Sequence, residues 1–222
     1  MDVKSKENEQ LGVFFLKNKS HINENLFETD NVNEAFVTNI PGKYHDHPEV
    51  IKAKHEEYNK WKTYEVFEEV METDDMNVLS SRIVVTEKED KVKVRLCVRG
   101  FEEVNYPQSD SPTARNDPQK LFLAIAANES FPVKTLDVTS AFLQGTPIDR
   151  DVFMEPPPEL KKEGMVWKLR KSVYGLYDAS RKWWLAVKEE LVSLGMKPVT
   201  GDEAVFMMHK NGKLDGLCCL KH

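Results

Sequence analysis

A carboxylate at the end of a predicted strand is the residue of this sequence best placed for chemistry. Residues 134–145 read KTLDVTSAFLQG, in which a short apolar strand delivers Asp137 to a turn and Phe142 follows five residues later. Magnesium is a hard cation that proteins usually bind through one or two carboxylates together with substrate phosphates. Asp137 is therefore a candidate magnesium ligand. Taken alone, an aspartate in such a position is more often a turn former or a helix cap.

A cationic strand supplies a second set of candidates. Residues 82–101 alternate with period two around a charged turn at residues 88–90, which predicts a β-hairpin. The alternation places Lys93, Arg95 and Arg99 on one face of the second strand. Such a face can hold a triphosphate through charge-assisted hydrogen bonds. A solvated hairpin face has the same pattern, so both interpretations stay open.

Helices are predicted on either side of these candidates. The first begins at residues 46–48 and runs to about residue 62, with Ile51, Tyr58 and Trp61 on its core face. A second is capped by Asp117 and ends near Ser130. Its expected apolar stripe is Leu121, Phe122, Ile125 and Ala126. A third, long helix is capped by Asp178 and contains Trp183 and Trp184, which are expected in the core rather than stacked on bases. A hairpin turn is predicted at Asn211 and Gly212.

Length and composition indicate a soluble, intracellular protein with a real core. The chain has 222 residues, of which 40% are hydrophobic. Its three cysteines give neither a disulfide framework nor the paired spacing of a zinc site. The apolar run at residues 11–16 is too short for a secretory signal or a membrane span, so no membrane partner is expected.

The net charge of −6 hides an asymmetry along the chain. Residues 1–80 hold 9 Lys and no Arg against 17 acidic residues, whereas residues 81–222 hold 22 basic and 20 acidic residues. Phosphate binding depends on Lys and Arg, so any phosphate-binding surface is expected in the second part. Residues 1–44 are rich in Asn, Lys and Glu without a sustained period, and we expect a disordered or linker segment there, followed by one domain over residues 45–222.

Five segments together resemble one family. They are KVKVRLCVRGFEE, SPTARNDPQKLFLAIAA, KTLDVTSAFLQG, VFMEPPPEL and VWKLRKSVYGLYDASRKWW. In order and approximate spacing, from about residue 48 to residue 220, the chain resembles the reverse transcriptase of copia-type retrotransposons. The fold that this resemblance implies is α+β: a partial right-hand polymerase with fingers around residues 80–130, an incomplete palm around residues 131–220, and no thumb.

The resemblance also implies an activity and roles for particular residues. The activity is RNA-directed DNA synthesis with Mg2+, deoxynucleoside triphosphates and an RNA or DNA template with its primer, within a parent polyprotein. The carboxylate of Asp137 would bridge two magnesium ions, with the backbone carbonyl of Val138 beside it. Phe142 would lie under the sugar of the incoming nucleotide and exclude a 2′-hydroxyl. Lys93 and Arg95 would contact the triphosphate. Tyr174 and Gly175 would let the backbone approach the nascent base pair.

The sequence departs from the family pattern in two places. The family's second catalytic motif, an apolar strand ending in two aspartates, would begin at GLCCLKH, where the sequence ends. The one adjacent acidic pair, Asp74 and Asp75, precedes Asp137 and is expected in an exposed turn. After Leu176 the family's lysine-containing pattern is replaced by Tyr177 and Asp178, which is expected to weaken template binding. The sequence therefore predicts a catalytically incomplete polymerase fragment. The alternative is a non-catalytic remnant that acts as a nucleic-acid-binding or polyprotein-interaction module.

Overall fold

Two compact units make up the chain in its computed structural model. The structure describes residues 12–17, 38–39, 42, 45–88, 91–105 and 107–221. Unit 1 is assembled from residues 1–32, 112–141 and 187–222, and unit 2 from residues 33–111 and 142–186. The architecture is mixed α and β, as the sequence predicts. The finer assignment to fingers and palm stays a prediction.

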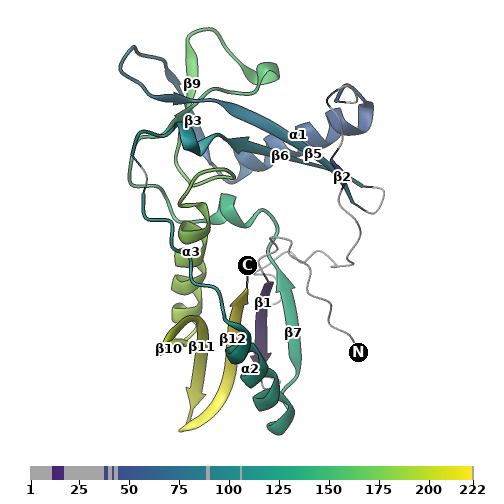
Figure 1. Cartoon of the computed structure of the whole chain (residues 1–222), viewed down its shortest axis with the longest axis vertical. Coiled ribbons are helices and arrows are strands. Elements are labelled where there is room, and N and C mark those ends of the chain that lie inside the picture. Colours follow the sequence, from purple (N-terminus) through teal and green to yellow (C-terminus); the bar gives the residue numbers. More distant parts are fainter. Residues whose placement is uncertain are drawn as a thin grey trace. The chain divides into compact units, whose positions relative to one another are not determined.

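Unit 1 is built on a five-stranded sheet in which every strand pair is antiparallel (Figure 1). In spatial order the strands are β10 (Lys197–Val199), β11 (Asp202–Lys210), β12 (Lys213–Lys221), β1 (Gly12–Lys17) and β7 (Val133–Asp137). Helix α2 (Asn116–Asn128) lies against β12. The turn between β11 and β12 contains Asn211 and Gly212, both with positive φ, so the predicted hairpin is confirmed.

Helix α2 differs in two details from its prediction. It begins at Asn116, with Arg115 at the N-cap, so Asp117 lies in the first turn instead of capping the helix. A carboxylate there still favours the helix because it faces the positive end of the dipole. The prediction that Leu121 belongs to the buried stripe is wrong, because its side chain is 62% exposed. Phe122 and Ala126, four residues apart, are buried as predicted, and Ile125 is half-buried.

Unit 2 contains two sheets. The first consists of β2 (Thr38–Asn39), β5 (Ser81–Lys88) and β6 (Lys91–Val98), and the β5–β6 hairpin is the one predicted from the alternation. The second consists, in order, of β3 (Phe67–Met71), β9 (Met165–Leu169), β8 (Phe153–Met154) and β4 (Val78–Leu79). Only the β4–β8 pair is parallel among these described strands. Short 3-10 turns lie at η3 (Gly100–Glu102), η4 (Ala141–Gln144) and η5 (Pro158–Leu160).

Helix α1 (Pro48–Thr63) covers β6 and joins the two sheets through one core (Figure 1). Trp61 is fully buried and packs with Trp167 of β9, whose ring stacks on Phe67 of β3 at 3.7 Å between centroids. The helix has the predicted start and end, but Ile51 is 42% exposed, so its prediction as a core residue is wrong. The buried stripe runs through Val50 instead, one position earlier.

Residues 1–44 lie for the most part outside the described residues. Two stretches of this range, β1 and β2, are strands that pair with sheets of unit 1 and unit 2, and neither strand was predicted. The boundary of a linker segment at residue 44 stays a prediction. In the described part of the chain no helix has the length and apolar character needed to cross a bilayer.

Glu57 is a buried carboxylate in the core of unit 2. Its side chain accepts hydrogen bonds from the backbone N–H of Leu96 at 3.2 Å and from Nε1 of Trp61 at 3.3 Å. Burial raises the pKa of Glu57, because removing a carboxylate from water disfavours its charged form. The folded protein therefore holds a proton at this site more tightly than the unfolded chain does. The resulting contribution to stability is present below the unfolded pKa and is lost as pH rises through the folded pKa.

We expect Glu57→Gln to be more stable than the parent at pH 8 and to lose that advantage toward pH 4. The amide oxygen keeps both accepted hydrogen bonds, and the side chain carries no buried charge. Glu57→Leu should instead be destabilised by about 1–3 kcal/mol at both pH values, because two buried N–H groups lose their acceptor. Thermal unfolding at the two pH values measures both variants. A pH-independent difference between Glu57→Gln and the parent would contradict the assigned titration.

Candidate nucleotide and metal sites

The predicted triphosphate contacts lie on the exposed face of the β5–β6 hairpin in unit 2. Lys93 and Arg95 are exposed, whereas Val94 and Leu96 are buried on the opposite face. The alternation predicted for β6 is thus confirmed. Among the described residues, no carboxylate forms an ion pair with Lys93 or Arg95, while Arg99 lies 3.9 Å from Glu102. The charges of Lys93 and Arg95 are therefore not neutralised by an ion pair within the described residues, although Arg95 also contacts the Tyr174 ring.

Three residues predicted for nucleotide binding converge in unit 2 from distant parts of the sequence. The ring of Phe142, in η4, meets the edge of Tyr174 with 5.1 Å between centroids. The guanidinium carbon of Arg95 lies 5.7 Å from the centre of the same Tyr174 ring. Burial raises the pKa of Tyr174 to about 12, although the nearby Arg95 opposes the shift. Tyr174 thus keeps its proton at neutral pH and separates an aromatic ring from a cation.

Gly175 is explained by a close approach of two backbone segments. Its φ is +97°, and a Cβ at this position would lie 1.9 Å from the carbonyl oxygen of Val98. On the facing segment, a Cβ at Gly100 would lie 2.3 Å from the carbonyl oxygen of Gly175. The N–H of Val98 donates to the carbonyl of Tyr174 at 2.8 Å. Glycine is therefore required here by packing inside unit 2, and contact with a base pair stays a prediction.

A buried ionic cluster lies directly after this segment and was not predicted. Arg150 donates to Asp178 at 2.6 Å and also pairs with Glu103. The hydroxyl of Ser172 donates to Asp178 as well. Asp178 is only 1% exposed, and its backbone carbonyl accepts from the N–H of Lys182 in the first turn of α3 (Ala179–Ser193). The carboxylate of Asp178 is therefore shielded from solvent and paired with Arg150. It gives no reason to expect repulsion of a template strand.

The two tryptophans that follow belong to the core, as predicted. Trp183 is 3% exposed and Trp184 is 4% exposed. Side chains this deeply buried cannot stack on bases while the protein is folded as described. Tyr177, by contrast, is 45% exposed.

Asp137 and Val138 belong to unit 1. Asp137 is the last residue of β7, half-buried, and its backbone lies opposite Gly12 of β1. Val138 follows it and is 7% exposed. A strand end that supplies one carboxylate and one carbonyl offers the oxygen donors that magnesium prefers. Among the described residues no group of three or more His, Cys, Asp or Glu side chains could hold a metal ion, so further ligands would have to come from elsewhere.

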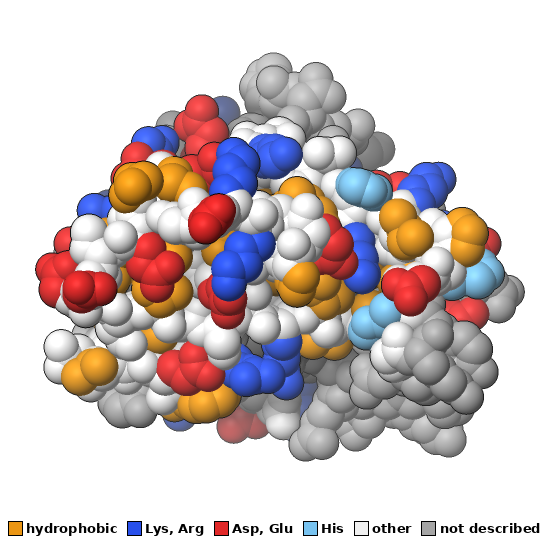
Figure 2. Space-filling model, turned by 90° about the horizontal axis from the view of Figure 1, so that it is seen from above, with side chains coloured by type: hydrophobic (Ala, Val, Ile, Leu, Met, Phe, Trp, Pro, Cys, Tyr) orange, Lys and Arg blue, Asp and Glu red, His pale blue; other side chains and the backbone are white. Residues whose placement is uncertain are grey.

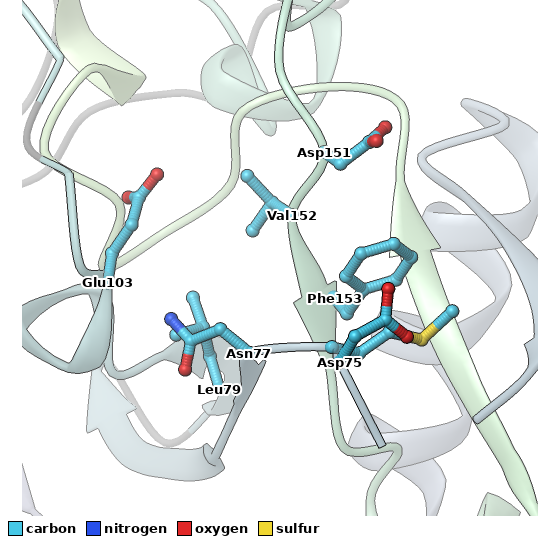
Figure 3. A pocket seen from close by; sticks show the side chains of 8 residues that line it. Asp75, Asn77, Leu79, Glu103, Asp151, Val152 and Phe153 are labelled. Carbon is cyan, nitrogen blue, oxygen red and sulfur yellow. The ribbon is translucent and has the colours of Figure 1, made fainter. Parts of the chain in front are cut away.

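The acidic pair Asp74 and Asp75 forms an exposed turn, as predicted. A hydrogen bond from the hydroxyl of Thr73 lowers the pKa of Asp75. Asp75 also lines a pocket of about 490 Å³ in unit 2, together with Glu103 and Asp151 from two other segments (Figure 3). None of the residues predicted for catalysis or nucleotide binding lines this pocket.

The charge on the surface is mixed. Figure 2 shows a face on which Lys and Arg side chains are interspersed with Asp and Glu side chains, with no broad area of one sign. Elsewhere in the described residues opposite charges also pair directly, as Arg170 does with Glu68 and Lys168 with Asp151. A nucleic-acid partner would therefore be held by a few local cations rather than by a strong overall field.

Comparison with known proteins assigns the family. Residues 63–217, more than half of the chain, match the family model described as reverse transcriptase (RNA-dependent DNA polymerase). The chain belongs to this reverse transcriptase family. The resemblance inferred from the sequence segments is thereby confirmed.

The similar curated proteins are transposon polyproteins. The chain is 32% identical over 127 residues to the retrovirus-related Pol polyprotein from transposon RE1 of Arabidopsis thaliana, covering 54% of this chain and 9% of that protein. It is 28% identical over 169 residues to the transposon Ty1-DR4 Gag-Pol polyprotein of Saccharomyces cerevisiae, covering 70% of this chain and 10% of that protein. The chain thus spans about a tenth of the length of these relatives. No solved structure matches it significantly.

We expect Gly175→Ala to cost about 3 kcal/mol or more of stability. The new methyl group would meet the Val98 carbonyl and would also need a positive φ, which alone costs roughly 1–2 kcal/mol in an L residue. The matched control is Gly164→Ala, which also has positive φ but no atom within 4 Å of its Cβ. Chemical denaturation of both variants separates the clash from the φ penalty. Equal losses would show that the contact with Val98 is dispensable.

Proposed function

We propose that this chain is part of the RNA-directed DNA polymerase of a copia-type retrotransposon polyprotein, with its unit 2 binding the incoming deoxynucleoside triphosphate. The observation that carries the proposal is the convergence of Arg95, Phe142 and Tyr174, whose positions in sequence span 79 residues. A cation beside one aromatic ring, which packs against a second ring, is suited to a ligand that has a phosphate end and a flat, apolar end. The family membership supports a nucleotide as that ligand.

Each of these side chains has a distinct task in the proposed site. Lys93 and Arg95 would hold phosphate oxygens through charge-assisted hydrogen bonds, and Arg95 could do so with two N–H groups at once. The ring of Phe142 would lie under the sugar and leave no room for a 2′-hydroxyl. Tyr174, held by the backbone contact with Val98, would keep the Phe142 ring in place.

Asp137 of unit 1 is proposed as a magnesium ligand, with the carbonyl of Val138. When bound, magnesium would neutralise the charge that develops on phosphate oxygens during nucleotidyl transfer. Two-metal transfer needs carboxylates from more than one strand, and residues 1–222 supply one at this strand end. We therefore propose that primer extension on an RNA or DNA template requires polypeptide in addition to these 222 residues.

Asp137→Asn is expected to weaken the binding of magnesium at this strand end by roughly tenfold, the value of one charge-assisted interaction. The amide keeps the size of the side chain and removes its negative charge. Asp117→Asn is the matched control, because Asp117 is an exposed aspartate of the same unit, in the first turn of α2. Calorimetric titration with magnesium measures the affinity of each variant. Equal affinities for the two variants would rule out Asp137 as a ligand.

Phe142→Ala is expected to narrow the preference for deoxyribonucleotides over ribonucleotides, because the proposed obstacle to the 2′-hydroxyl is that ring. Competition binding with dATP and ATP gives the ratio of the two affinities. Phe153→Ala, which also shortens a partly buried phenylalanine of unit 2, is the control and should leave the ratio unchanged. Lys93→Ala and Arg95→Ala should weaken the binding of dATP and of ATP by the same factor. An unchanged ratio in Phe142→Ala would mean that the ring serves packing only.

A further inference from the structure

One inner strand of the unit 1 sheet comes from far away in the sequence. Strand β1 lies between β12 and β7 and pairs with both along its length, from Gly12 opposite Lys221 to Lys17 opposite Gly216 on one side. The nearer of its two neighbours in sequence, β7, begins at Val133, more than a hundred residues after β1 ends. Strand β1 also precedes the segment that matches the reverse transcriptase family, which begins at residue 63.

Without β1 the sheet would be open between β12 and the edge strand β7. Strands β7 and β12 are each antiparallel to β1, so they run parallel to each other and are separated by two strand spacings of about 4.8 Å. At that distance their backbone groups cannot pair directly. Each strand would present a row of unpaired N–H and C=O groups, which is a ready template for another strand. The gap is therefore an acceptor site for one antiparallel strand of about six residues.

The same position suits a second kind of occupant. A strand that followed β12 through a tight turn would run antiparallel to β12. Because β11 already occupies one side of β12, this strand would have to lie on the other side, in the position that β1 fills. Such a strand would close a loop of a few residues, whereas β1 closes one of more than a hundred residues to reach β7. Loop-closure entropy favours the shorter connection.

We propose that residues 12–17 of this chain act as an exchangeable strand that occupies the acceptor site between β7 and β12, and that they compete there with a strand continuing from β12. Gly12 lies opposite both Asp137 and Lys221, so the occupant pairs with the backbone of Asp137 itself. Exchange would thereby change the backbone partner of the candidate metal ligand. This consequence for Asp137 rests on the proposed function, whereas the strand site does not.

Native cysteines provide a direct test in the full chain. Cys218 and Cys219 are buried in β12, opposite Phe15 and Phe14. Paired residues of antiparallel strands have Cα atoms about 4.5–5.5 Å apart, which lies within the range that a disulfide spans. Phe15→Cys and Phe14→Cys are therefore each made singly and oxidised. At least one is expected to form an intramolecular disulfide with its facing cysteine, identified by peptide mass spectrometry.

Two control variants share the sheet. Val205→Cys on β11 faces Cys219 and should form a disulfide, which shows that these buried thiols can react. Lys17→Cys faces Gly216 and should not. If Val205→Cys reacts and neither Phe14→Cys nor Phe15→Cys does, β1 does not fill the acceptor site and the proposal fails. Disulfides that join two chains would show that a second copy supplies the strand, which overturns the intramolecular assignment.

Competition is tested by adding a strand. The reactive variant is extended beyond His222 by a glycine-containing turn and a second copy of residues 12–17 without cysteine. The yield of its disulfide is expected to fall by roughly tenfold or more, because the short loop favours the new strand. An unchanged yield would show that the site does not exchange. These readouts involve no nucleotide or metal, so they can fail or succeed independently of the proposed polymerase function.

Discussion

The close approach of two backbone segments at Gly175 is the constraint on which the candidate nucleotide site depends. The end of β6 and the segment after Ser172 come so near that neither Gly100 nor Gly175 has room for a Cβ. This contact brings Tyr174 to the side of the strand that carries Arg95, and Phe142 packs on the same tyrosine. A side chain at either glycine would push the segments apart and separate the aromatic rings from the cation. Backbone packing therefore precedes any chemistry that the side chains could perform.

The buried ionic cluster fixes the other end of the same segment. Arg150 pairs with Glu103 and Asp178, and Ser172 donates to Asp178. Removing three charged groups from water is costly, and such clusters often add little net stability. Their geometry is nevertheless specific, because a buried charge that loses its partner is strongly unfavourable. The cluster thus holds the start of α3 and the segment before it in one arrangement, which limits the positions that Tyr174 can take.

Sequence periodicity predicted the local elements well and the long-range ones poorly. The alternation of residues 91–98 identified the exposed cations, and Asn211 with Gly212 identified a hairpin, because each signal is contained in a few residues. Each predicted helical face contains one wrong residue, Ile51 in α1 and Leu121 in α2, because apolar type does not say which neighbour the fold supplies. The role of Asp178 could not be predicted either, because its partner Arg150 is 28 residues earlier.

Strand β1 shows the limit of local reasoning most clearly. GVFFLK has an apolar stretch of the right length for a strand, but the strands that pair with it begin more than a hundred residues later. The acceptor site needs both β7 and β12 in place, because each supplies one of its two edges. Pairing of such a strand first requires the closure of a long loop, which costs conformational entropy before the new hydrogen bonds can offset it. We therefore expect the sheet to be completed late in folding, when β1 pairs with β12 and with β7, the strand that ends in Asp137.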